Sequence, residues 1–188
     1  MYYHASQISD IKILEPRISN HGQPLIYFSL KRENVLVYLS NAIEKFCKET
    51  GFVNNGIWTK WGSYGFEKSG ILVLEEYYPN ALSETYKGVS GYIYYAENLD
   101  LNNNNIGINN VVTTSKPVMI NGFEVISDAY MEIVKAAAKG EIKLVKYEDH
   151  SADKLNWIKN TIFNEYNNPD IKSDYKYFIE NKFPFVQE

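Results

Sequence analysis

The residues of this 188-residue chain whose types and positions could do chemistry are three histidines and a tyrosine near the end of a strand. His4 follows two tyrosines at the end of a short opening strand, whereas His21 lies in a turn and His150 in a loop before a helix. Tyr27 lies near the end of a short apolar strand that leads into an amphipathic helix. An imidazole can hydrogen-bond a ligand, and a tyrosine ring can stack on a flat one. Packing within the strands is the alternative explanation for both residues.

The strong catalytic and metal-binding motifs are absent from the sequence. It has no glycine-rich phosphate loop, no G-x-S-x-G elbow, no H-E-x-x-H and no C-x-x-C. A structural zinc site would need all three histidines together with Cys47, so we expect no bound metal. Cys47 lies on the apolar face of a predicted helix, which favours a buried core thiol over a nucleophile.

The amino-acid composition limits the classes of protein to which this chain can belong. Hydrophobic residues make up 45% of the chain and charged residues 22%, which is typical of one globular domain. The net charge of −4 argues against a general binder of nucleic acid or of an anionic membrane. One cysteine cannot form an internal disulfide, the N-terminus lacks the pattern of a signal peptide, and no apolar run is long enough to span a bilayer. We therefore expect a cytoplasmic protein.

The hydrophobic pattern predicts an α+β fold. We expect strands in residues 1–4, 25–28, 71–77, 91–96, 111–113, 118–120, 123–125 and 142–147. We expect helices in residues 35–47, 127–139 and 175–181, and one that begins after Ser151 and ends before Pro169. Ser29 and Ser127 are the expected caps of the first two helices, and Gly51 and Gly140 their stops. Asn121-Gly122 predicts a tight hairpin, and no linker divides residues 1–188, whose last part, from about 127, is helical.

Two short motifs together resemble a known fold. The motif Y-H-A-S at residues 3–6 is followed by I-Y-F-S at residues 26–29 and a helix. This order resembles the ADP-ribosyltransferase-type fold, and most of all its small His–Tyr branch, which includes the rifampin ADP-ribosyltransferases and the RNA 2′-phosphotransferases. In that branch an opening H-G-[ST] precedes a [VI]-Y-[FA]-[ST] strand, and a later strand has the form G-x-[VI]-Y-x-V-E-P. Here GYIYYAEN at residues 91–98 is similar to that later strand, and TSKPV at residues 114–118 to the strand after the polar loop.

The resemblance implies a mixed or antiparallel split β-sheet with flanking helices, and NAD as a bound substrate. It covers residues 2–47 and 90–126, and it implies that His4 hydrogen-bonds a ribose hydroxyl of NAD. Ala5 would lend backbone groups to the nicotinamide amide, Ser6 matches the hydroxyl residue of the family's motif in the same NAD site, and Tyr27 would stack on the nicotinamide ring. Ala5 stands where the family usually has glycine. We therefore predict that His4 and Tyr27 face one cleft, with His21 and His150 outside it.

The catalytic acid that the resemblance implies is Glu97, with Asp100 as the second choice. Cleavage of the glycosidic bond of NAD builds positive charge, which a carboxylate stabilises. Because side chains alternate along a strand, Tyr95 and Glu97 share one face, and Tyr94 and Ala96 lie on the other, more apolar face. A solvated surface glutamate is the alternative. Asparagines replace the acid-rich stretch of the family.

Three functions remain open from the sequence. The first is an NAD-binding protein that transfers ADP-ribose or hydrolyses NAD. The second is a non-enzymatic protein-interaction module on the same fold. The third is an RNA-directed, NAD-dependent phosphotransferase, which the net negative charge disfavours. The sequence does not name the acceptor of a transferred group.

Overall fold

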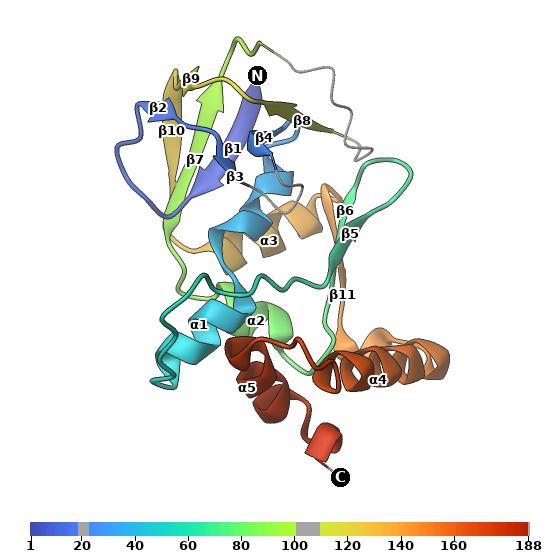
Figure 1. The fold of residues 1–188 in the computed structure, drawn as a ribbon. Helices are drawn as coiled ribbons and strands as arrows, with labels where there is room; N and C mark the ends of the chain where they lie inside the picture. Colours follow the sequence, from blue (N-terminus) through green and yellow to red (C-terminus); the bar gives the residue numbers. More distant parts are fainter. Residues whose placement is uncertain (19–22, 101–109, 188) are drawn as a thin grey trace. The chain divides into compact units, whose positions relative to one another are not determined.

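The computed structural model describes residues 1–18, 23–100 and 110–187 and confirms an α+β fold (Figure 1). The chain divides into two compact units. The first consists of residues 1–39, 65–73 and 86–143, and the second of residues 40–64, 74–85 and 144–188. Because the chain passes between the units several times, no linker is visible in the sequence. Among the described residues, no helix has the length and apolar character needed to cross a membrane.

An antiparallel sheet organises the first unit (Figure 1). Its main order is β10-β7-β1-β4-β3, and β8 also pairs with β4. The strands are β1 (Tyr2–Ser6), β3 (Arg17–Ile18), β4 (Pro24–Ser29), β7 (Gly91–Ala96), β8 (Val111–Thr114) and β10 (Gly122–Ile126). Tyrosine, isoleucine and valine recur in them, as expected of residues that pack on a pleated surface. The sequence predicted all of these strands except β3.

Each face of this sheet is covered in part. On one face, β2 (Ile13–Leu14) and β9 (Val118–Met119) pair with each other and supply Leu14 and Val118 to a core cluster with Phe28. The other face receives the 3₁₀-helix η1 (Glu33–Leu39), next to α3 (Ala129–Ala138). A methyl group on Gly91 would lie only 2.7 Å from Leu39, which shows how closely η1 approaches β7.

The predicted hairpin at Asn121-Gly122 is wrong. The strand before it, β9, pairs with β2, and the strand after it, β10, pairs with β7. Instead, Asn121 donates its backbone N–H to the carbonyl of Tyr95 at 3.0 Å and accepts the N–H of Glu97 on its side chain at 2.9 Å. A methyl group on Gly122 would overlap the hydroxyl end of the Tyr95 side chain. Gly122 therefore leaves room for the Tyr95 ring and does not form a tight turn.

The single helix predicted over residues 35–47 is two helices. The 3₁₀-helix η1 ends at Leu39, and α1 (Ala42–Glu49) begins in the other unit. Asn41 separates them with an extended backbone, donating from its side chain to the Thr59 carbonyl at 2.8 Å and accepting the Trp61 N–H at 3.3 Å. Ser29 ends β4 and caps neither helix. The stop at Gly51 is confirmed by its positive φ of 76°.

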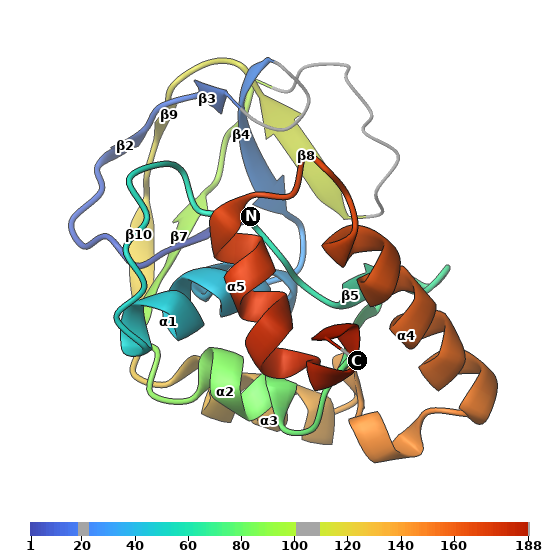
Figure 2. The ribbon, with the colours of Figure 1, turned by 60° about the horizontal axis from the view of Figure 1, so that its bottom comes forward.

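The second unit is built from helices. They are α1, α2 (Ala81–Tyr86), α4 (Ala152–Tyr166) and α5 (Ser173–Lys182), with the 3₁₀ segments η2 (Tyr147–Asp149) and η3 (Pro184–Gln187). Figure 2 shows α1 and α5 side by side. Buried residues of α1, α4 and α5 form the core, among them Cys47, Ile158 and Phe178. Cys47 is fully shielded from solvent, as predicted.

The remaining elements link or complete the units. The short strands β5 (Tyr64–Phe66), β6 (Leu72–Glu75) and β11 (Ile142–Val145) form a second sheet in the order β11-β6-β5.

The predicted cap Ser151 accepts the Lys154 N–H at 3.2 Å. For α3 the predicted cap was wrong by one residue, since Asp128 accepts the Met131 N–H at 3.1 Å. Of the helices after about residue 127, α3 belongs to the first unit, and α4 and α5 belong to the second.

Candidate functional site

His4 lies where β1 and β4 separate. β1 pairs with β7 along five residues, whereas only Tyr3 and Ser29 pair between β1 and β4 among the described residues. Just beyond that pair, His4 donates from Nδ1 to the carbonyl oxygen of Tyr27 at 2.9 Å. A neutral imidazole that donates from Nδ1 carries a lone pair on Nε2, so Nε2 is a hydrogen-bond acceptor.

The surroundings of His4 favour its neutral form. Loss of solvation on burial lowers the pKa of the imidazole, the hydrogen bond to Tyr27 opposes this, and the charge of Arg17 lowers the pKa further. The net effect holds the pKa below its ordinary value of 6.5. At neutral pH His4 therefore presents an uncharged acceptor with a fixed tautomer.

The side chains of His4 and Tyr27 project from opposite faces of the sheet. Tyr3 and Ser29 lie directly opposite each other and so share a face. Because side chains alternate along a strand, Tyr27 shares the face of Ser29, and His4 lies on the other. The rings of His4 and Phe28, 5.8 Å apart, agree with this register. The prediction that His4 and Tyr27 face one cleft is therefore wrong, and their direct link is imidazole to backbone.

The two small residues after His4 remain in β1. Ala5 is buried, 8% exposed, so its methyl group is accommodated within the packed sheet. Ser6 is partly buried, and its hydroxyl oxygen accepts the N–H of Ile8 at 3.1 Å. Ala5 lies opposite Ile93 in β7, and Ser6 lies opposite Tyr92. Both residues thus follow His4 along β1 and pair with β7.

The two candidate acids follow β7 and are exposed. Glu97 donates its backbone N–H to the side chain of Asn121 at 2.9 Å, which fixes the chain where the strand ends. Asp100 forms an ion pair with Lys116. The predicted alternation is confirmed in part, because Tyr94 and Ala96 are fully buried.

Two polar side chains that sequence reasoning missed are buried in the first unit. Asn34 of η1 is 1% exposed, and both polar atoms of its amide lack a hydrogen-bond partner among the described residues. Thr113 is also 1% exposed, and its hydroxyl has no such partner in the described part of the chain. Thr113 lies opposite Tyr27 and therefore shares its face. The only sequence signal for Asn34 was a polar residue within an apolar helical run.

Of the other two histidines, only His150 is among the described residues. His21 lies outside the described residues. His150 belongs to the second unit, where its Nε2 hydrogen-bonds the carbonyl oxygen of Glu76 at 2.9 Å. Within residues 1–18, 23–100 and 110–187, no group of three or more histidine, cysteine, aspartate or glutamate side chains could hold a metal ion.

Comparison with protein-family models, with curated proteins and with solved structures gave no match.

Proposed function

We propose that this chain is an ADP-ribosyltransferase-like protein that binds NAD or a related nucleotide where β1 and β4 separate. The observation that supports this proposal best is the hydrogen bond between His4 and the Tyr27 carbonyl at that separation. It holds a neutral imidazole with Nε2 as an acceptor, which suits the hydroxyl donor of a ribose. Cys47 as the only cysteine is consistent with action in the cytoplasm.

The roles within this site follow the register of the strands. We assign ribose recognition to His4 and the backbone contacts with the ligand to Ala5 and Ser6. Tyr27 contributes its carbonyl, which orients His4. Because the Tyr27 ring lies on the opposite face from His4, we do not assign it to stacking on a nicotinamide that His4 also contacts.

A transferase or NAD hydrolase also needs a carboxylate near the reacting ribose. We propose Glu97 for this role, with Asp100 as the alternative. Glu97 is exposed at the end of β7, the strand that pairs with β1. The carboxylate of Asp100 is already paired with Lys116, which makes it the weaker candidate.

The test of binding is a thermal-shift titration with NAD, ADP-ribose and nicotinamide. A ligand that binds only the folded state raises the melting temperature once its concentration exceeds the dissociation constant. We expect NAD and ADP-ribose to raise it in the wild type and to lose most of this effect in His4→Phe, with Tyr3→Phe as the control on the same strand. A melting temperature that none of the three ligands changes contradicts the proposal.

The test of catalysis is NAD turnover in Glu97→Gln and Asp100→Asn. Each substitution keeps the shape of the side chain and removes its charge. If wild-type turnover is lost in Glu97→Gln and kept in Asp100→Asn, Glu97 is the acid. Turnover that survives both substitutions excludes this segment from the chemistry, whereas nucleotide binding without turnover supports a non-enzymatic role.

The interaction module is a second candidate, favoured by exposed apolar residues of the first unit. Ile13 and Met119 lie opposite each other on β2 and β9 and are 50% and 76% exposed. On β10, at the end of the main sheet order, Phe123 and Val125 are exposed as well. Exposed apolar side chains that lie together are typical of protein-contact surfaces. Loss of self-association or of partner binding in Met119→Ser would support this candidate.

A further inference from the structure

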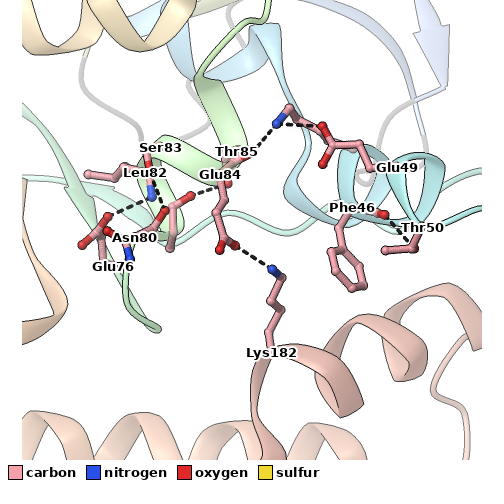
Figure 3. A network of polar contacts seen from close by, with 12 residues as sticks. Phe46, Glu49, Thr50, Glu76, Asn80, Leu82, Ser83, Glu84, Thr85 and Lys182 are labelled. Atoms are coloured by element: carbon pink, nitrogen blue, oxygen red, sulfur yellow. Dashed lines mark hydrogen bonds and ion pairs between the residues drawn. The ribbon is translucent and has the colours of Figure 1, made fainter.

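A pocket in the second unit is lined by charges and aromatic rings. It has a volume of about 270 Å³ and lies between α1, α2 and the end of α5. Lys45 and Lys182 supply ammonium groups. Glu49 and Glu84 supply carboxylates, and Phe46 belongs to the apolar wall (Figure 3). The pocket is smaller than the roughly 300–1,000 Å³ of sites for drug-sized ligands. It therefore suits a compact ligand.

The two ammonium groups meet at one residue. Lys182 pairs with the Glu84 carboxylate at 2.6 Å (Figure 3). Lys45 donates to the Glu84 carbonyl oxygen at 2.5 Å. Lys45 also pairs with Glu49 at 3.1 Å. An ammonium group has three N–H donors, so these contacts leave donors on both lysines.

The lysine side chains of the pocket are more buried than its glutamate side chains. The side chains of Lys45 and Lys182 are 22% and 17% exposed, whereas those of their partners Glu49 and Glu84 are 60% and 43% exposed. These fractions refer to whole side chains, so the buried part of each lysine includes its aliphatic stem. An anion that enters a partly enclosed pocket interacts with such lysines through less screening than at an open surface.

The wall of the pocket adds a planar apolar surface. The Lys182 ammonium lies 4.5 Å from the centre of the Phe46 ring and 5.4 Å from that of Tyr78. Tyr78 is 5% exposed, and burial raises the pKa of its hydroxyl, so it stays neutral. A ligand with a flat or apolar portion can cover these rings while its charged end reaches the lysines.

We propose that this pocket binds a compact organic anion, with a carboxylate or phosphate held by Lys45 and Lys182 and an apolar portion against Phe46 and Tyr78. The site belongs to the second unit and does not depend on nucleotide binding by the first.

The experiment is calorimetric titration of the full chain with benzoate and phenyl phosphate at constant ionic strength, with benzamide as the uncharged analogue. We expect both anions to bind at millimolar concentration and benzamide to bind at least tenfold more weakly, as for the loss of a charge-assisted hydrogen bond. Lys182→Met, which keeps the length of the stem, should weaken anion binding about tenfold or more.

The matched control is Lys154→Met. Lys154 lies in the same unit, pairs with Glu75 at 3.0 Å and lies 4.4 Å from the Trp157 ring, but it does not line the pocket. The Lys154→Met substitution should leave anion binding unchanged. Lys45→Met and the salt dependence of wild-type binding give independent readouts if Lys182→Met does not fold. Absence of anion binding, equal binding of benzamide, or equal loss in Lys154→Met overturns the proposal.

Discussion

The hydrogen bond of His4 can be weighed by replacing the histidine with phenylalanine. His4→Phe keeps an aromatic ring beside Phe28, whose ring centre is 5.8 Å from that of His4, and removes the donor to the Tyr27 carbonyl at 2.9 Å. A net hydrogen bond contributes about 0.5–1.5 kcal/mol, and a buried carbonyl without a donor costs about 1–3 kcal/mol. The greater hydrophobicity of phenylalanine offsets part of this loss. We therefore expect the free energy of unfolding to fall by about 1–2 kcal/mol.

The assay is urea unfolding of wild type and variant above neutral pH, followed by circular dichroism. For a chain of this size, 1 kcal/mol corresponds to about 2–4 °C in melting temperature, so a thermal scan should show a fall of about 2–8 °C. His4→Asn is a second variant, because the asparagine amide can place a donor near the position of Nδ1. If His4→Phe is as stable as the wild type, the hydrogen bond to Tyr27 does not hold β1 and β4 at this point.

Further predictions concern pH dependence, the thiol and two packing sites. Because the pKa of His4 in the folded protein lies below 6.5, the unfolded chain takes up a proton first as the pH falls. The stabilisation of the folded state by neutral His4 is therefore complete above pH 6.5 and is lost as the pH falls toward the pKa of folded His4. The difference in the free energy of unfolding between wild type and His4→Phe should shrink from pH 8 to pH 5. Cys47 is fully buried, with its pKa raised to about 11, so a thiol reagent should label it only after denaturant is added, and fast labelling of the native chain would contradict its place in the core. Gly122→Val should cost about 1–3 kcal/mol by collision with the Tyr95 ring, and much less in a Tyr95→Ala background, as a double-mutant cycle in urea would show. Asn41→Ala removes hydrogen bonds from both sides of its amide and should lower the melting temperature, whereas an unchanged value would show that the break between η1 and α1 does not depend on them.

Local patterns in the sequence predicted those elements that local interactions determine. The strand over residues 91–96 and the helix capped by Ser151 were predicted because alternation, helical spacing and capping are encoded within a few residues. The prediction failed where distant partners decide the structure. Asn121-Gly122 has the sequence of a tight hairpin, but β9 and β10 find different neighbours, β2 and β7.

In the candidate site too, local patterns predicted the strands, whereas distant contacts determine how the side chains are placed. The sequence placed His4 and Tyr27 on two strands, and the structure makes those strands neighbours. Which face each side chain occupies depends on the register between β1 and β4, and a shift by one residue would reverse it. No pattern within either strand encodes that register. Likewise, the burial of Asn34 and Thr113 without a partner among the described residues depends on tertiary packing.

The most direct test of nucleotide binding at His4 is nuclear magnetic resonance of the chain labelled with ¹⁵N in its histidines, titrated with NAD. In the free protein the two ring nitrogens of His4 should show a neutral imidazole protonated at Nδ1, as the hydrogen bond to Tyr27 requires. With NAD, the Nε2 resonance of His4 should shift saturably, in the direction of an acceptor that gains a hydrogen bond, while His150, bound to the Glu76 carbonyl, stays unchanged. If His4 does not respond to NAD while the protein remains folded, or if only His150 responds, the proposed site is wrong.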